Sequence, residues 1–244
     1  MSEARLLGAA AAIEALVVDL DDTLFPQAAW LDGACDAVAW RAAENGVDPA
    51  ALRRALSVTL SGGSDTGRVI DEALALAGVG AGVVVVEELV DVFRAYAPAR
   101  LPTYPGVRDA LAMLARRVPI ALVSDGAPLC QRSKLVATGV EEYLSVVVLS
   151  DELGREHRKP DAAPFLMALR SLGSMPAATV VIGDRPDKDI EGAARAGMRA
   201  VRVRTGEHKG RGDHPRTWAV APDFSGAAGL VEPLLVGASS QAPC

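Results

Sequence analysis

Asp19 and Asp21 directly follow a short apolar run and are the residues of this sequence best placed to do chemistry. The run at 16–18 has the composition of a strand, and on a continuing strand residues i and i+2 point to the same face. Two carboxylates that converge on one point repel each other unless a cation or a shared proton stabilises them. The pattern therefore indicates a hard-cation site, a nucleophile or an acid/base pair. The alternative is an ordinary acidic turn after a strand.

A second acidic group follows another apolar run, which ends at Gly183. A glycine at this point admits the close approach of a neighbouring group. Asp184 comes next, and Asp189 follows five residues later at the expected start of a helix. This arrangement favours a divalent cation, with Asp187 serving as a helix cap.

Two further segments are suited to binding an anion. Ser124, Asp125 and Gly126 join an expected strand to an expected helix, where a hydroxyl and free backbone N–H groups form an anion cradle. A plain strand-to-helix turn is the alternative. Lys159 precedes Pro160, which we expect to open a helix, and it can reach an anionic group near the edge of the sheet. The alternative for this lysine is a solvated surface position.

The elements that must position these residues alternate along the second half of the chain. This alternation of strands and helices predicts a parallel sheet with right-handed crossovers. Residues 26–97 have a helical pattern, 98–105 form a proline-rich linker, and 204–222 are expected to be a loop. Strands are expected at 15–20, 118–124, 145–149, 178–183 and 199–203, and helices at 105–117, 128–138, 161–172, 187–196 and 225–236.

Composition excludes several classes of protein. The 244 residues carry a net charge of −6 and are 50% hydrophobic, so no bulk basic surface indicates a nucleic-acid partner. No stretch approaches the roughly 18 uninterrupted apolar residues of a membrane span. Cys35, Cys130 and Cys244 are far apart, odd in number, and match no CxxC or zinc spacing. We therefore expect a cytoplasmic protein with reduced thiols and no membrane partner.

Taken together and in order, four motifs resemble those of the haloacid dehalogenase superfamily of phosphohydrolases. The first is DxDxT at 19–23, and the second is the apolar strand 120–124 ending in serine. The third is Lys159, and the fourth is GDxxxxD at 183–189. The first and fourth motifs are specific in combination, whereas the other two are weak alone.

The resemblance implies a fold and its division into domains. It implies an α/β protein with a Rossmann-like, doubly wound parallel sheet core at residues 1–25 and 105–244. Between the first strand and the second motif, residues 26–104 are similar to an inserted all-α cap domain, the subclass I cap of the superfamily. In relatives with such a cap, it closes over the site and supplies specificity contacts. Here the candidates are the loop at 61–64 and, as a weak specificity residue, Arg68.

The resemblance also implies catalytic roles. Asp19 is expected to be the nucleophile that forms an aspartyl-phosphate. Asp21 is expected to protonate the leaving oxygen as general acid and then to activate water as base. Thr23 is expected to orient Asp21. Because an alkyl halide leaves without protonation, the presence of Asp21 favours phosphate esters over halides.

The expected metal ion is Mg²⁺, which prefers oxygen ligands and keeps several waters. By the resemblance it is held by the Asp19 carboxylate, the Asp21 backbone carbonyl and Asp184, with Asp189 acting through water.

The phosphate is expected to bind Ser124 and backbone N–H groups near Asp125 and Gly126, while Lys159 offsets negative charge. The sequence thus predicts a Mg²⁺-dependent hydrolase of a small phosphorylated metabolite, either monomer or homodimer. A phosphotransferase or mutase with the same intermediate and a non-catalytic binding protein are the alternatives.

Overall fold

A six-stranded parallel sheet forms the centre of the protein in a computed structural model that describes residues 12–63, 67–80 and 82–236. The strand order is β3-β2-β1-β4-β5-β6, so the chain runs outward from β1 in one direction and then from β4 in the other. Ser64 of the predicted cap loop and Cys244 lie outside the described residues. The strands are β1 (Ala15–Val18), β2 (Ile120–Ser124), β3 (Val146–Leu149), β4 (Thr179–Gly183), β5 (Arg199–Val203) and β6 (Ala219–Ala221).

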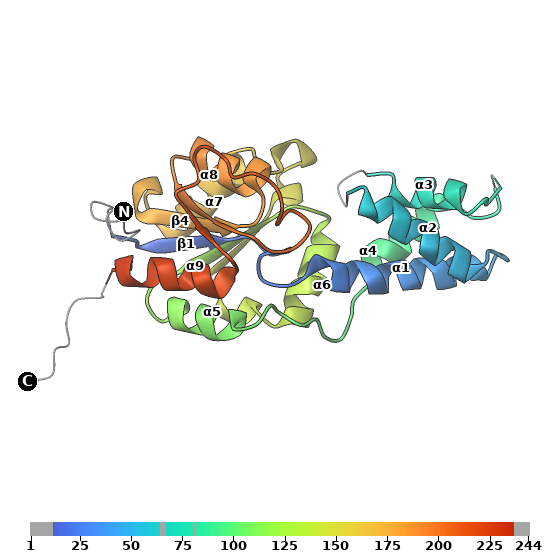
Figure 1. The fold of residues 1–244 in the computed structure, drawn as a ribbon, viewed down its shortest axis with the longest axis horizontal. Coiled ribbons are helices and arrows are strands. Elements are labelled where there is room, and N and C mark those ends of the chain that lie inside the picture. Colours follow the sequence, from blue (N-terminus) through green and yellow to red (C-terminus); the bar gives the residue numbers. More distant parts are fainter. Residues whose placement is uncertain (1–11, 64–66, 81, 237–244) are drawn as a thin grey trace, which may run out of the picture.

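Helices cover both faces of this sheet (Figure 1), which makes it the doubly wound, Rossmann-like sheet that the sequence predicts. Alternate residues of β1 enter different cores: Leu16 and Val18 pack with α5 and α9, and Val17 packs with α7 and α8. The core helices are α5 (Val107–Ala115), α6 (Pro128–Thr138), α7 (Ala163–Leu172), α8 (Glu191–Arg195) and α9 (Phe224–Val231). Short 3-10 helices lie at Glu141–Tyr143, Ser150–Glu152, Arg155–His157, Pro176–Ala178 and Glu232–Leu234, and a π-helical turn lies at Pro186–Ile190.

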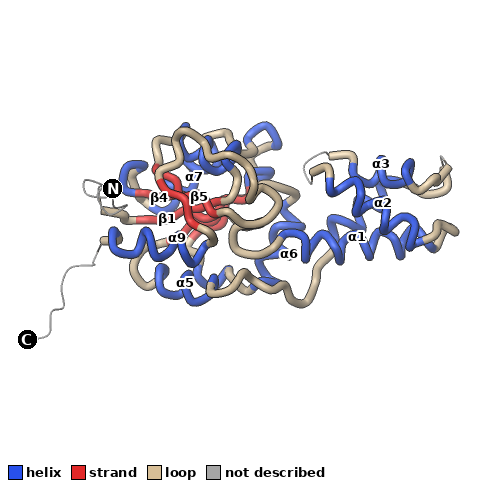
Figure 2. Tube along the Cα trace, viewed as in Figure 1, coloured by secondary structure: helices blue, strands red, loops and turns tan. Residues whose placement is uncertain are grey.

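A bundle of four helices is inserted between β1 and β2 (Figure 2). The helices bury an apolar cluster of their own, which includes Leu52, Leu56 and Leu89, because each of them turns its apolar side inward. Trp30 belongs instead to the apolar cluster that packs α5 and α9 against the sheet, and it thereby joins the insertion to the core. The helices are α1 (Gln27–Ala43), α2 (Pro49–Ser61), α3 (Val69–Leu76) and α4 (Val86–Ala95).

Two expectations for local structure are wrong. The segment 204–222 was expected to be a loop, but it contains β6, which pairs with β5 at the edge of the sheet. Three residues are too few to produce a clear alternation of polar and apolar side chains. Pro160 does not open a helix: the Asp161 carboxylate accepts a hydrogen bond from the Ala163 N–H group at 2.7 Å, and α7 begins only there.

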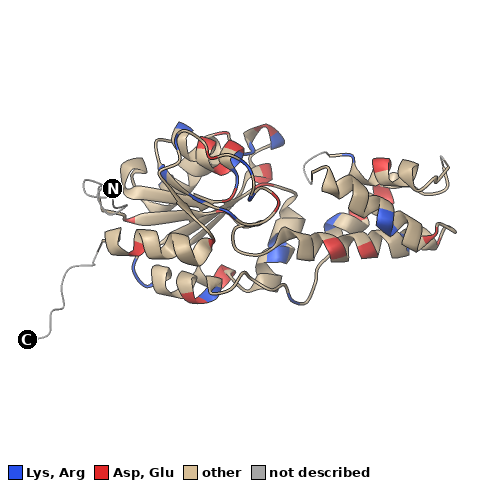
Figure 3. Ribbon diagram, in the orientation of Figure 1, with Lys and Arg blue, Asp and Glu red and all other residues tan. Residues whose placement is uncertain are grey.

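Charged residues of both signs are interspersed over the core and the insertion (Figure 3). Within the described ranges, no helix has the length and apolar character needed to cross a bilayer.

Candidate active site

The carboxyl ends of three neighbouring strands bring the predicted residues together. Val18 of β1 pairs with Leu122 of β2 and with Ile182 of β4, so the residues that follow these three strands lie side by side at the carboxyl end of the sheet. This edge lies where the strand order changes direction, the usual ligand site of open α/β sheets.

Lys159 is the cation at the centre of the cluster. Its Nζ atom donates hydrogen bonds to Asp19 Oδ1 at 2.5 Å, to Asp189 Oδ1 at 2.8 Å and to the Val123 carbonyl oxygen at 3.2 Å. Burial opposes the charge of this lysine, yet the carboxylates of Asp189 and Asp19 hold its pKa well above its ordinary value. Lys159 is only 5% exposed, so the alternative interpretation of this residue as a solvated surface lysine is wrong.

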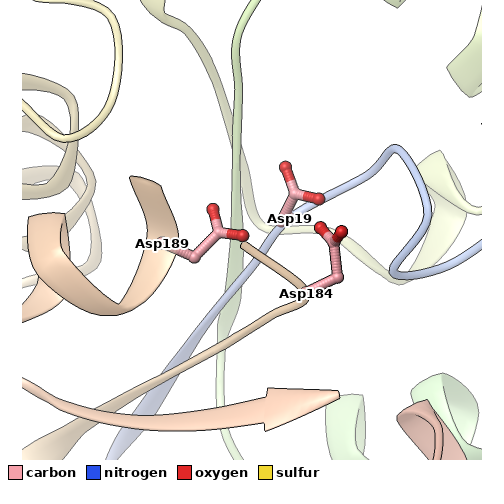
Figure 4. Close-up of side chains that lie close together, drawn as sticks. All are labelled: Asp19, Asp184 and Asp189. Carbon is pink, nitrogen blue, oxygen red and sulfur yellow. The ribbon is translucent and has the colours of Figure 1, made fainter. Parts of the chain in front are cut away.

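Three buried carboxylates, those of Asp19, Asp184 and Asp189, converge beside this lysine (Figure 4). Each offers one oxygen atom, and these atoms lie within 4.8 Å of one another. Burial raises the pKa of Asp19 to about 7 although Lys159 lowers it, and burial with the charges of Asp189 and Asp19 raises that of Asp184. Among the described residues, Asp184 Oδ2 is buried without a hydrogen-bond partner. Such a group is costly to bury, and the donor set fits a hard divalent cation.

The Asp189 carboxylate is held by the residues around it. Its Oδ2 accepts a hydrogen bond from the Arg185 N–H group at 2.9 Å, and its Oδ1 is bound by Lys159. The expected close approach at Gly183 is confirmed, since a Cβ atom there would lie 2.4 Å from Asp189 Cγ. Asp189 therefore positions Lys159, while Asp19 and Asp184 have more freedom to bind a cation.

The predicted anion cradle lies next to the carboxylates. Ser124 Oγ accepts a hydrogen bond from Gln131 Nε2 at 2.5 Å, and Gly126 has a φ of +122°, which favours glycine. The Asp125 carboxylate instead accepts hydrogen bonds from the Ser150 hydroxyl at 2.7 Å and the Lys159 N–H group at 3.0 Å. The Asp125 side chain thus braces the loop, which leaves its backbone N–H as the group suited to an anion.

The loop after Asp21 is held from the opposite side of the site. Asp22 has a φ of +57°, and its carboxylate accepts hydrogen bonds from the N–H groups of Gln27 at 2.9 Å and Glu207 at 3.0 Å. A Cβ atom at position 206 would lie 1.9 Å from Asp22 Cγ, so Gly206 is needed for this contact. Thr23 is fully buried, and its hydroxyl has no hydrogen-bond partner among the described residues. No bond from Thr23 to Asp21 supports the expected orienting role.

Two residues that sequence reasoning missed contact Asp21. Lys134 Nζ lies 2.8 Å and 2.9 Å from the two carboxylate oxygens of Asp21, and Gln131 Nε2 lies 2.8 Å from Asp21 Oδ2. Gln131 and Lys134 are three positions apart on α6 and therefore share one face. This spacing, directly after the Ser124 loop, was the signal available in the sequence.

Two adjoining cavities open at the site. The smaller, about 70 Å³, is lined by residues that include Asp19, Ser124 and Lys159. The larger, about 320 Å³, lies between the core and the insertion; Leu60 and Gly67 line it on either side of the predicted cap loop. Arg68 is exposed at the start of α3 and is not among the residues that line this cavity.

Comparison with known proteins gives a consistent result. A family model described as haloacid dehalogenase-like hydrolase matches residues 13–197. A glyceraldehyde 3-phosphate phosphatase of Methanopyrus kandleri is 34% identical over 218 residues, 87% of this chain and 92% of that protein. A phosphoserine phosphatase of Thermus thermophilus is 40% identical over 126 residues, 51% of this chain and 47% of that protein. The structure of a 2-haloacid dehalogenase from Pseudomonas syringae pv. Tomato DC3000 has a TM-score of 0.61 at 28% identity, covering 90% of this chain and 98% of that one.

Proposed function

The chain belongs to the haloacid dehalogenase-like hydrolases, and on this premise we propose that it is a Mg²⁺-dependent phosphatase of small metabolites that acts through an aspartyl-phosphate on Asp19. Its family and its phosphatase relatives make it a hydrolase of phosphate monoesters. The observation that carries the finer proposal is the Lys159 contact with Asp19 and Asp189, beside the unsatisfied Asp184 carboxylate.

In the proposed reaction, Asp19 attacks phosphorus and Asp21 protonates the departing oxygen. Asp21 then takes a proton from the water that hydrolyses the intermediate. Ser124 and the N–H groups of its loop bind the phosphate oxygens, and Lys159 keeps the Asp19 carboxylate oriented and offsets the charge.

Mg²⁺ would be held by the carboxylates of Asp19 and Asp184 and by the backbone carbonyl of Asp21, and Asp189 would act through water. When bound, it supplies charge neutralisation for phosphoryl transfer.

The larger cavity accounts for the proposed class of substrate. It shares Asp21, Gln27 and Asp125 with the smaller cavity, so a phosphate in one places its leaving group in the other. Its volume of about 320 Å³ suits a small metabolite and lies at the lower end of the usual ligand-site range. We propose that the helical insertion, residues 26–104, acts as the cap that encloses this leaving group. A cytoplasmic location and the monomer or homodimer state remain predictions.

The direct test is release of inorganic phosphate from a panel of small phosphomonoesters, with Mg²⁺ or with EDTA. We expect release with Mg²⁺ and its loss in EDTA, because the carboxylates repel the phosphate without the cation. Equal rates in Mg²⁺ and EDTA would contradict the metal requirement. Phosphate that appears on a sugar rather than in solution would favour the phosphotransferase alternative.

The pH dependence of metal binding gives a second prediction: Mg²⁺ should raise the melting temperature more at about pH 8 than at about pH 5.5. The pKa of Asp19 is about 7 in the folded protein and near 3.8 in the unfolded chain. Between these two pH values the folded state keeps a proton on Asp19 that the unfolded chain has released. Metal-free stability therefore falls as pH rises through this window, and at the higher pH the cation displaces fewer protons. Differential scanning fluorimetry measures both effects.

The control for this prediction is the exposed Asp109. The variant Asp109→Asn should keep the full Mg²⁺ effect, whereas Asp184→Asn should lose most of it. An Mg²⁺-induced shift that is larger at the lower pH would count against carboxylate ligands.

A further inference from the structure

Lys134 is a buried cation for which the proposed mechanism has no use. It is 3% exposed, and its Nζ atom binds both oxygens of the Asp21 carboxylate, at 2.8 Å and 2.9 Å. Removing a lysine from water is costly, so a buried pair of this kind is weak evidence for a purely stabilising role. The contact fixes both oxygens of one carboxylate, which prevents that group from rotating.

The same face of α6 also connects Asp21 to the anion cradle. Gln131 donates to Asp21 Oδ2 at 2.8 Å and to Ser124 Oγ at 2.5 Å. One helix thus holds the proposed proton donor and the proposed phosphate-binding hydroxyl in a fixed relation. A general acid must lie within hydrogen-bond reach of the oxygen that it protonates.

The insertion contributes the third contact of Lys134. Its Nζ atom lies 4.7 Å from the centre of the Trp30 ring, within the range of a cation–π interaction. Trp30 lies on α1 and is itself fixed by an edge contact with Phe93 of α4, with ring centres 5.1 Å apart. Lys134 therefore lies at the junction of the insertion and the core.

We propose that Lys134 is a positioning residue for proton transfer: it fixes the Asp21 carboxyl group where its proton reaches the ester oxygen, and Trp30 holds Lys134 in place. This inference rests on the proposed function, since it needs Asp21 to act as general acid. As the phosphorus–oxygen bond of the ester breaks, a bond from Asp19 to phosphorus forms and the Asp21 proton moves to the leaving oxygen. Lys134 keeps its own protons throughout.

The test is the dependence of kcat/KM on the leaving group, measured for the wild type and Lys134→Met with a series of substituted phenyl phosphates and alkyl phosphates. This ratio covers the steps up to departure of the leaving group and therefore excludes the later attack of water. p-Nitrophenolate departs without protonation, whereas an unsubstituted phenolate or an alkoxide needs the acid. We expect less than about a threefold loss for p-nitrophenyl phosphate and about a 10²-fold loss for the best alkyl phosphate, the lower end of general-acid effects.

Two variants of the same helix complete the design. Arg132 is exposed on α6 and pairs with Glu152 at 2.7 Å, so Arg132→Met should leave both rates unchanged. Lys134→Arg retains the charge but displaces the donor atoms, and we expect a smaller loss, again confined to the poorer leaving groups. This variant also keeps the test decisive if Lys134→Met does not fold.

Equal losses on all esters would overturn the positioning role, because a general loss of structure does not discriminate between leaving groups. Unchanged rates for Lys134→Met would overturn it as well. If the wild type hydrolyses none of these esters, the proposed function fails, and the inference fails with it. If the wild type is active and only the selective loss is absent, the proposed function stands and the inference alone is wrong.

Discussion

Replacement of Asp19 by asparagine should reduce phosphate release by about 10⁴-fold or more, the largest effect we expect from any single substitution. An amide is a poor nucleophile, and the change removes the carboxylate that forms the proposed acyl phosphate. It also removes the carboxylate that Lys159 contacts at 2.5 Å. The measurement is the turnover of the best substrate of the panel, together with acid-quench trapping of phosphorylated protein.

The matched control is Asp109→Asn, which makes the same chemical change at an exposed position of α5. It should keep wild-type turnover and the trapped intermediate. If Asp19→Asn retains more than about a hundredth of the wild-type rate, another residue must be the nucleophile. Circular dichroism of both variants separates loss of chemistry from loss of fold.

Replacement of Lys159 by methionine should give the largest loss of stability. The lysine lies between the carboxylates of Asp19 and Asp189, and without it these charges remain buried and uncompensated. Breaking a buried pair in this way typically costs about 3–5 kcal/mol of unfolding free energy. Turnover should also fall by about 10²–10³-fold, as when one contact to a developing charge is removed. Urea denaturation without metal measures the first effect.

The pH dependence of this loss identifies its cause. Because protonation of Asp19 removes one of the repelling charges, the loss should be smaller well below its pKa of about 7 than above it. Added Mg²⁺ should restore part of the stability. Lys209→Met, at an exposed position, changes the net charge equally and should have little effect. A loss that is independent of pH would indicate that packing, not charge, explains the role of Lys159.

The sheet and the central site could be predicted because their signals are local. The apolar runs before Asp19, Ser124 and Asp184 each end in a polar residue, and parallel strands bring such ends to one edge. The topology thus converts three separate motifs into one cluster. Lys159 can contact this cluster because it lies in the connection that follows the carboxyl end of β3.

The remaining contacts depend on long-range packing that no local pattern records. In the sequence, Lys134 has the pattern of an ordinary polar residue of a helix. Only the packing of α6 on the core brings its side chain to Asp21, which lies 113 positions earlier. The hydroxyl of Thr23 was assigned to Asp21 by resemblance, but the fold gives it no such bond. Arg68, the weak specificity candidate, is exposed and does not line the larger cavity, because the packing of the insertion on the core brings other residues there.

The central position of β1 also has a consequence for synthesis on the ribosome. Val18 pairs with Leu122 and Ile182, so this apolar strand emerges long before either of its neighbours exists. At ordinary elongation rates of about 5–20 residues per second, the gap before β4 emerges lasts roughly 10–30 s. The helices α1 to α4 pack against one another within residues 27–95, so all of them emerge during that interval. The contacts within the insertion can therefore form first, while the strand that precedes Asp19 still lacks both of its partner strands.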